Sequence, residues 1–176
     1  MKIIKTKLKD SYLIELEKKE DERGFFTRAW DKKVFEENGL DANLAQSNIS
    51  LSKKKGTLRG MHYQEHPFAE TKLIRCTRGK IYNVVIDLRP ESKTYLKWEG
   101  IELNEDKYIL RYIPKGFANG IQTLEDNSEI FYQVSQFYTP EAEMGIKWNE
   151  PIFNIDWPEK ISVISKKDSS WKPFKL

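Results

Sequence analysis

The sequence predicts a mostly β protein with a few short helices, built as a sandwich, jelly roll or barrel. Three observations support this prediction. Apolar and polar residues alternate with a period of two in several short stretches, which is typical of strands. Turn-forming residues recur between these stretches. Only short segments carry a helical pattern.

The first predicted element is a short helix in DKKVFEENG, at residues 31–39, which ends on a glycine as many helices do. A strand is predicted at residues 73–77, and residues 78–80 form the turn to the next strand. In that next strand, GKIYNVVIDLRP, one face carries Ile81, Asn83, Val85 and Asp87. The other face carries Tyr82, Val84, Ile86 and Leu88.

Three further strands are predicted in TYLKWEGIEL, KYILRYIP and EIFYQVSQFY. The breakers between them are Pro90, Asn104, Pro114 with Gly116, Asp126 with Asn127, and Pro140. The tail from Pro158 is predicted as a second helix. Barrels of such strands hold ligands in their mouths, lined by alternate residues of several strands.

Composition predicts one soluble globular domain over residues 1–176, because the chain is long enough to bury a core and shows no linker or repeat. A net charge of +3, with 30 basic and 27 acidic residues interspersed, predicts no nucleic-acid partner.

The single cysteine, Cys76, fits a reducing compartment, and its apolar run LIRC predicts a buried structural thiol. No apolar stretch approaches ~18 residues and no signal-peptide core is visible, so we expect no membrane partner and a cytoplasmic protein.

Polar side chains at inward-facing strand positions are the candidates for chemistry. They are Arg59, His62, Lys72, Asn83, Asn119 and Tyr132, with Gln46 and Asn48 in QSNIS. A lone histidine is more often packed or solvated than catalytic, and Tyr132 taken alone is predicted to be a core tyrosine with a bonded hydroxyl. The role of His62 therefore has to be judged from its neighbours.

A metal site is the first alternative. GMHYQEHPFAETKLIRCTRG and YIPKGFANGIQTL resemble, in spacing, the two motifs of the cupin superfamily of small jelly-roll barrels. Metal-binding cupins draw two histidines and a glutamate from the first motif and a histidine from the second. His62 and His66 are spaced wrongly for that pair, and the second motif offers Asn119, a poor ligand for zinc or iron(II). We expect no metal and no other cofactor.

Seven motifs in order make the resemblance more specific. DERGFF, QSNIS, LRGMHYQ with KLIRCTRG, DLRPES, IPKGFANG, FYQVSQFYTPEAEMGIKWNEP and SKKD resemble those of the dTDP-4-dehydrorhamnose 3,5-epimerase family. The match is colinear from about residue 20 to 170. These enzymes are cupin-fold homodimers that act without metal on nucleotide-linked 4-keto-6-deoxyhexoses. The resemblance implies a cupin jelly-roll isomerase in the synthesis of bacterial capsule or lipopolysaccharide.

Epimerisation beside a ketone requires a base on one face of the sugar, an acid on the other and a cation near the carbonyl oxygen. His62 matches the family's base and Tyr132 matches its acid. Asp168 in SKKD matches the carboxylate that orients the imidazole, as in other His–Asp pairs. Lys72 is the candidate for the cation.

The nucleotide end of the substrate follows from the same resemblance. The positions that hold the diphosphate and nucleoside match Arg23, Gln46, Asn48 and Arg59. Tyr138 matches the aromatic residue that stacks on the base, and Glu143 and Lys167 match further ligand contacts. By analogy, the loop of Arg23 reaches the partner subunit's site, so a homodimer completes each site.

Three departures from the family pattern leave the substrate open. The family usually has histidine at Asn119 and aspartate at Asn83, so two neutral amides replace a His–Asp pair if these residues face each other. Inversion at C3, at C5 or at both then remains open. Arg28 stands where a glutamate commonly contacts thymine, which leaves a GDP-linked 4-keto sugar, including a heptose, beside a dTDP-linked one.

Two other classes are weighed against the epimerase. One is a non-catalytic cupin that binds nucleotide sugars, which the joint retention of base, orienting acid, opposite acid and lysine argues against. The other is a metal-dependent oxygenase or isomerase, which the metal-ligand pattern argues against.

Overall fold

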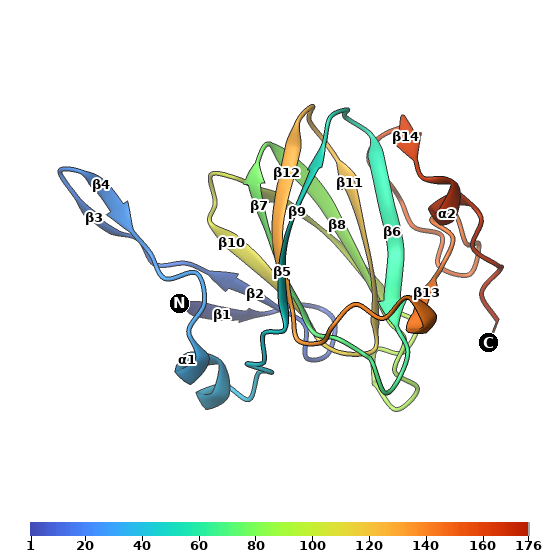
Figure 1. The fold of residues 1–176 in the computed structure, drawn as a ribbon, viewed down its shortest axis with the longest axis horizontal. Coiled ribbons are helices and arrows are strands. Elements are labelled where there is room, and N and C mark those ends of the chain that lie inside the picture. Colours follow the sequence, from blue (N-terminus) through green and yellow to red (C-terminus); the bar gives the residue numbers. More distant parts are fainter. Residues whose placement is uncertain (176) are drawn as a thin grey trace.

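Two sheets face each other in the computed structural model, which describes residues 1–175 (Figure 1). The first sheet has the strand order β1-β2-β10-β7-β12-β5, and all its pairings are antiparallel. These strands are Lys2–Lys5 (β1), Tyr12–Glu15 (β2), Ile109–Ile113 (β10), Lys72–Arg78 (β7), Ser128–Val134 (β12) and Gln46–Ser52 (β5).

The second sheet has the order β13-β6-β11-β8-β9. Its strands are Glu143–Gly145 (β13), Thr57–Gln64 (β6), Phe117–Thr123 (β11), Lys80–Asp87 (β8) and Trp98–Asn104 (β9). A short strand near the C-terminus, Val163–Ile164 (β14), pairs in parallel with β6. The predicted mostly β class is confirmed, and each strand predicted from the sequence overlaps an observed one.

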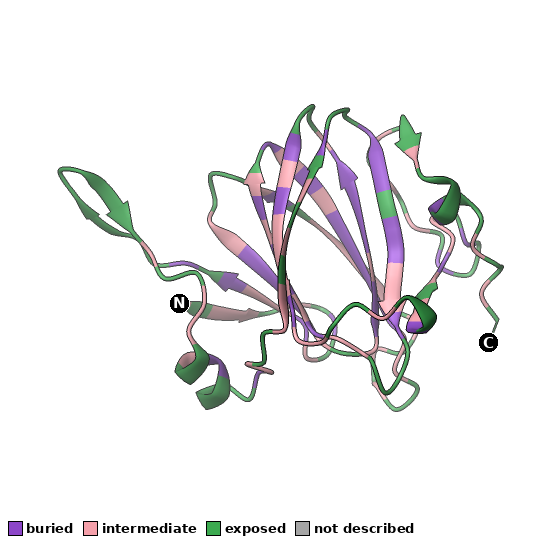
Figure 2. Cartoon of the chain, in the orientation of Figure 1, coloured by how far each residue is buried: buried purple, intermediate pink, exposed green. Residues whose placement is uncertain are grey.

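The predicted alternation along β8 separates two layers of packing. Ile81 and Val85 lie in the core between the sheets, together with Ile74 and Cys76 of β7 and Ile130 of β12. The side chains of the intervening residues pack on the outer face of the second sheet, in a cluster that includes Val84, Ile86, Tyr82 and Leu88. Figure 2 shows the buried positions following the strands of both sheets. The predicted burial of the Cys76 thiol is confirmed, and burial raises its pKa to about 11.

The predicted N-terminal helix is confirmed, whereas the predicted C-terminal helix is mostly wrong. Helix α1 spans Lys32–Glu37; Asp31 caps it by accepting from the backbone N–H groups of Lys33 and Val34. In the tail, only Lys166–Ser169 (α2) is helical. Before it, Val163–Ile164 instead form β14, because the open edge of β6 satisfies their backbone groups. Within residues 1–175, no helix is long and apolar enough to cross a membrane.

A hairpin of Lys19–Asp21 (β3) and Gly24–Phe26 (β4) projects away from both sheets (Figure 1). All of its strand residues are exposed, and the Phe26 side chain remains 61% exposed. The hairpin therefore has little of its own chain to pack against.

A one-turn 3₁₀ helix, Pro140–Ala142 (η1), leads into β13.

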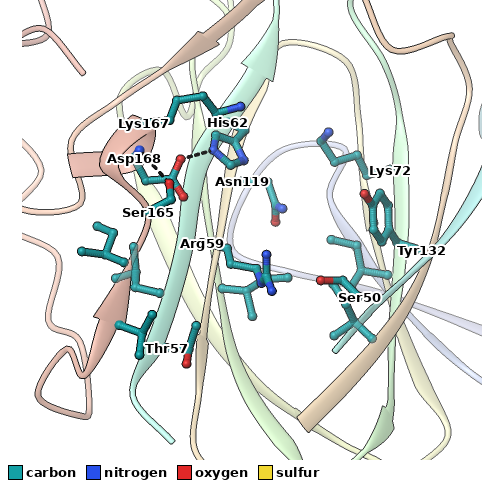
Figure 3. Close-up of a pocket in the computed structure, with 16 residues that line it drawn as sticks. Ser50, Thr57, Arg59, His62, Lys72, Asn119, Tyr132, Ser165, Lys167 and Asp168 are labelled. Carbon is teal, nitrogen blue, oxygen red and sulfur yellow. Dashed lines mark hydrogen bonds and ion pairs between the residues drawn. The ribbon is translucent and has the colours of Figure 1, made fainter. Parts of the chain in front are cut away.

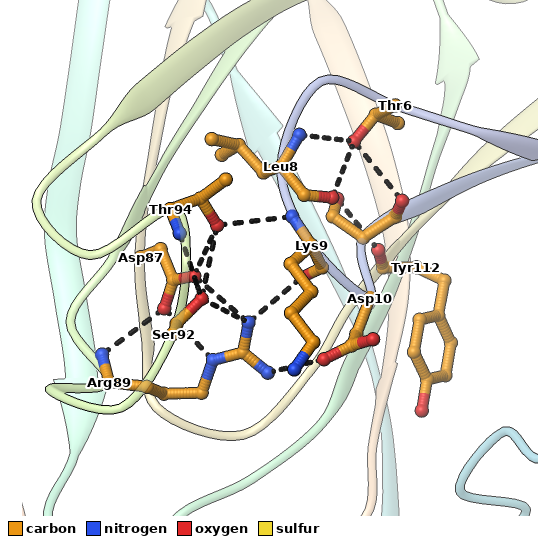
Figure 4. Close-up of polar contacts among 10 residues, drawn as sticks. Thr6, Leu8, Lys9, Asp10, Asp87, Arg89, Ser92, Thr94 and Tyr112 are labelled. Atoms are coloured by element: carbon orange, nitrogen blue, oxygen red, sulfur yellow. Dashed lines mark hydrogen bonds and ion pairs between the residues drawn. The ribbon is translucent and has the colours of Figure 1, made fainter.

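A buried carboxylate organises the loop that follows β8 (Figure 4). Asp87 is fully buried and accepts from the Arg89 guanidinium (2.9 Å from Nε and from Nη2) and from the Thr94 hydroxyl (2.6 Å). Arg89 also donates to Asp10, which anchors the loop between β1 and β2 (2.9 Å). Burial alone would raise the pKa of Asp87, but the hydrogen bonds from Arg89, Ser92 and Thr94 outweigh it and lower the pKa.

We expect Asp87→Asn to lower the free energy of unfolding by about 3 kcal/mol, because it removes one partner of a buried ion pair and sets an NH₂ group against donors. The matched control Asp10→Asn should change it by less than about 1 kcal/mol, because the Asp10 side chain is 45% exposed. Urea unfolding measures both.

Because folding lowers the pKa of Asp87, its contribution is present above the unfolded value of 3.8 and is lost as pH falls through the folded one. As pH falls, the difference in free energy of unfolding between wild type and Asp87→Asn should therefore become smaller. A gap that stays constant down to the acid transition contradicts this assignment.

Candidate active site

A cavity of about 410 Å³ lies between the sheets at one end of the barrel (Figure 3). The second sheet contributes Arg59, His62 and Asn119, and the first sheet contributes Lys72 and Tyr132. A second cavity of about 440 Å³ adjoins it and shares His62, Lys72 and Tyr132. The structure thus brings the central residues predicted from the sequence to one continuous space.

On one wall, His62 of β6 pairs with Asp168 of α2. His62 Nε2 lies 2.6 Å from Asp168 Oδ1, and the Gly60 backbone N–H donates to Asp168 Oδ2 (3.1 Å). The Asp168 side chain is only 5% exposed. Ser165 caps α2 by accepting from the Asp168 backbone N–H, which fixes the position of the backbone that carries the carboxylate.

The electrostatics of this pair fix the histidine tautomer. Burial alone would raise the pKa of Asp168, but the hydrogen bond and charge of His62 and the Gly60 N–H outweigh it, so the pKa lies below its usual value. An ionised Asp168 can only accept a hydrogen bond, so Nε2 carries the proton and donates to it. Neutral His62 therefore carries its free lone pair on Nδ1.

On the facing wall, Tyr132 of β12 and Lys72 of β7 come from neighbouring strands (Figure 3). Burial raises the pKa of Tyr132, and the charge of Glu70 adds to this, so the phenol is protonated at neutral pH. The Lys72 ammonium forms an ion pair with Glu70, and both side chains are largely buried. This wall therefore offers a phenolic proton and a positive charge.

Asn119 lies beside the histidine. It is directly opposite His62 in the register of β11 and β6, and its Oδ1 accepts from Asn83 Nδ2 of β8 (2.7 Å). The two departures from the family pattern are thus in contact as a pair of neutral amides. They lie on neighbouring strands of one sheet rather than across the barrel.

The remaining predicted contacts line the cavity mouth. Arg59 is held by Ser52 Oγ (3.0 Å from Nε) and by the Leu51 carbonyl (3.1 Å from Nη2). Gln46 and Asn48 of β5 line the second cavity, and Gln46 Oε1 accepts from the Tyr138 backbone N–H (2.7 Å). The last group is a cluster of Tyr138, Glu143 and Lys167.

In that cluster, the Tyr138 hydroxyl donates to Glu143 (2.7 Å), and Lys167 donates to both of its carboxylate oxygens (2.8 Å). Burial alone would raise the pKa of Glu143, but its bonds to Lys167 and Tyr138 lower it. The Tyr138 side chain stays 55% exposed, so its ring is open to a ligand.

Two predicted residues lie outside the cavity of their own chain. Arg23 sits in the projecting hairpin, where it pairs with Asp21 (2.6 Å) and its side chain is 89% exposed. Arg28, between the hairpin and α1, pairs with Asp31 (2.8 Å) and is also exposed. Neither residue lines either of the two cavities that His62 lines.

Three residues at the site were not singled out from the sequence. Glu70 holds Lys72, Ser165 caps the helix of Asp168, and the Trp171 ring packs edge-on against His62 with centroids 6.2 Å apart. Trp171 also covers Gly145, where any added Cβ would overlap it. The spacing of Glu70 from Lys72, and the serine before a short helical stretch, were available as signals; the tail packing of Trp171 had none.

Comparison with known proteins gives a consistent result. The family model described as dTDP-4-dehydrorhamnose 3,5-epimerase matches residues 5–175. The chain is 40% identical to dTDP-4-dehydrorhamnose 3,5-epimerase of Methanothermobacter thermautotrophicus over 178 residues, covering 99% of this chain and 95% of that one.

A solved structure agrees in fold. The crystal structure of dTDP-4-dehydrorhamnose 3,5-epimerase from Bacillus anthracis, with TDP and PPi bound, matches with a TM-score of 0.94 and 38% identity, covering 98% of this chain and 99% of that one. A relative with a narrower name, dTDP-4-dehydrorhamnose 3-epimerase of Streptomyces niveus, is 34% identical over 153 residues, covering 86% of this chain and 73% of that one.

Proposed function

Because the chain belongs to the dTDP-4-dehydrorhamnose 3,5-epimerase family, and is therefore a cupin-like isomerase of a nucleotide-linked 4-keto-6-deoxy sugar, we propose that His62 and Tyr132 carry its proton transfers. One observation carries the proposal. An imidazole paired with a carboxylate faces a phenol and an ammonium across a single cavity (Figure 3).

Proton removal falls to His62. A ketone at C4 acidifies the protons on C3 and C5, and a base near neutrality is needed to take one. Since Asp168 occupies Nε2, Nδ1 is the atom that accepts the substrate proton, and Asp168 stabilises the imidazolium that forms. A general base of this kind contributes roughly 10²- to 10⁴-fold to the rate.

The enolate that forms carries its charge on the C4 oxygen. The Lys72 ammonium, on the facing wall, stabilises this charge, an effect typically worth about 3 kcal/mol when a donor is well placed. The ion pair with Glu70 holds the long side chain of Lys72 in the cavity.

Tyr132 returns a proton to the opposite face of the ring. It stands on the sheet that faces His62, so a sugar held between the sheets meets the base on one face and the phenol on the other. The raised pKa of Tyr132 keeps its hydroxyl protonated until the enolate accepts the proton.

The second cavity receives the nucleoside, and the diphosphate lies where this cavity adjoins the first, which Arg59 lines. Arg59 suits the diphosphate, because its planar guanidinium donates in pairs to phosphate oxygens. The exposed Tyr138 ring stacks on the base, with Gln46, Asn48, Glu143 and Lys167 around it. dTDP and GDP remain the two nucleotides to test, and the product enters synthesis of a surface polysaccharide.

A homodimer completes each site. The β3–β4 hairpin carries the exposed Phe26 and Arg23 away from the chain's own sheets, as an arm that docks on a partner does. Exposed apolar residues on β5, Ile49 (69%) and Leu51 (42%), provide further surface for association. In the dimer, Arg23 adds a second guanidinium to the partner's diphosphate site, and Arg28 approaches the base.

The function is tested by NMR in deuterated water with dTDP- and GDP-linked 4-keto-6-deoxy sugars supplied separately. We expect deuterium at C3, C5 or both in wild type, and no exchange at any position in His62→Asn, which should still bind the nucleotide. The matched control His66→Asn, the other histidine and an exposed one, should exchange at the wild-type rate. Exchange that persists in His62→Asn would falsify the assignment of the base.

Tyr132→Phe should separate the two proton transfers. The variant lacks only the returning proton, so deuterium exchange should persist while formation of inverted product falls by about 10²-fold or more. Equal loss of exchange and inversion would show that Tyr132 is not the acid.

Mixing subunits tests the shared site. Arg23→Ala and His62→Asn subunits should each be impaired alone at limiting substrate. Refolded together, they should recover about one quarter of wild-type activity, because half of the dimers are mixed and each mixed dimer carries one complete site out of two. No recovery on mixing would place Arg23 outside the partner's site.

A further inference from the structure

The orientation of the Asn83 amide is set by a backbone carbonyl. Asn83 is fully buried, and its Nδ2 donates to Gly120 O (3.0 Å) as well as to Asn119 Oδ1 (2.7 Å). Its backbone is held in turn, because Arg111 Nη1 donates to Asn83 O (2.8 Å). A carbonyl can only accept, so the amide nitrogen, and not the amide oxygen, must face Gly120.

The orientation of Asn119 follows from that of Asn83. Since Asn83 presents its NH₂ group, Asn119 must present its oxygen in return, and its own NH₂ group is left for the cavity that Asn119 lines (Figure 3). The opposite arrangement would set the Asn83 oxygen against the Gly120 oxygen. A backbone carbonyl thus dictates, through two amides, that the cavity meets a donor beside His62.

This orientation leaves one polar atom without a partner. Asn83 Oδ1 is buried and accepts no hydrogen bond within residues 1–175. Buried polar groups are usually hydrogen-bonded. An unpaired acceptor therefore indicates that this orientation of the Asn83 amide serves another contact, which offsets the cost of the unpaired oxygen. What it does here is to direct the Asn119 NH₂ group.

We infer that Asn119 donates a hydrogen bond to the ketone oxygen of the bound sugar and that Asn83 is the positioning residue that aims this donor. The inference rests on the proposed function, because the oxygen concerned belongs to the 4-keto sugar that His62 deprotonates. The carbon that loses its proton is bonded to the ketone carbon, so a donor beside His62 on the neighbouring strand is placed to bond that oxygen. The bond strengthens as the oxygen becomes an enolate.

Asn119 and Lys72 then form a mixed pair of donors from opposite sheets, one neutral and one charged. The neutral donor does not titrate, so it keeps its proton at any pH at which the protein is folded. Its strength depends on geometry alone, and therefore on Asn83.

Asn83→Asp tests the relay, because a carboxylate in the same shape accepts from Asn119 and turns the Asn119 oxygen toward the cavity. We expect kcat to fall about 10- to 100-fold, the loss of one hydrogen bond to a charged oxygen, with KM changed less than about threefold. Asn119→Ala should show the same loss. Asn83→Leu, which frees Asn119 without burying a charge, serves if Asn83→Asp does not fold.

The double variant Asn83→Asp with Asn119→Ala distinguishes positioning from a general structural effect. Because both changes remove the same donor, the double variant should be no slower than Asn119→Ala alone. Losses that multiply would overturn the inference. The pH profile of kcat should keep its wild-type shape in Asn119→Ala, since neither amide titrates. A shifted profile would mean that the change had disturbed the His62–Asp168 pair, and this result would also overturn the inference.

The failure of this inference is separable from that of the proposed function. If wild type exchanges deuterium through His62 but Asn119→Ala exchanges at the wild-type rate, Asn119 is not the donor and the proposed function stands. If wild type shows no exchange that depends on His62, both are wrong.

Discussion

The 2.6 Å contact between His62 and Asp168 is the interaction on which the site depends. It joins β6 to a helix of four residues that lies 106 positions later in the chain. So short a helix has little stability of its own, and its place is set by the pairing of β14 with β6 and by the Ser165 cap. The His62 imidazole is therefore oriented only when the C-terminal segment has docked, so the proposed proton transfer requires the complete fold.

The proposed mechanism also requires reacting groups on both faces of the sugar ring, and the two facing sheets provide them. His62 belongs to one sheet, and Tyr132 and Lys72 belong to the other, so their separation is a property of the fold and not of any loop. Groups carried on paired strands are held by backbone hydrogen bonds on both sides, which limits their motion. In the proposed function the nucleotide lies at the rim instead, where Arg59 and Tyr138 are among exposed side chains.

Much of this arrangement was predictable from sequence, for identifiable reasons. The alternation along residues 81–88 predicts which side chains face the core, because strand geometry leaves no other choice. The tail was mispredicted as helical because its extended course depends on an edge of β6 that no local pattern reveals. Trp171 was missed for the same reason, since it acts through its contact with His62, far away in the sequence. Glu70 pairs with Lys72 only two positions later, a signal that the sequence did carry. Arg23 and Arg28 show the converse case, in which motif matching names residues that lie outside both cavities of the described chain.

Asn83 and Asn119 form a pair of amides where the resemblance to the family implies an aspartate and a histidine, and the fold accommodates this pair without a change in its strands. Two amides can satisfy each other, as a carboxylate and an imidazole can, but they do so without exchanging a proton. Asn83 and Asn119 add no titrating group to the wall beside His62, where the ionising groups that act on His62 include Asp168 and Glu143. In the proposed mechanism the neutral amides add no charge near the ketone oxygen, so more of the enolate's stabilisation falls to Lys72. If His62 is the base, it accepts through one atom, Nδ1, and from one direction, so the placement of the sugar at the rim decides whether the proton of C3, of C5 or of both is removed.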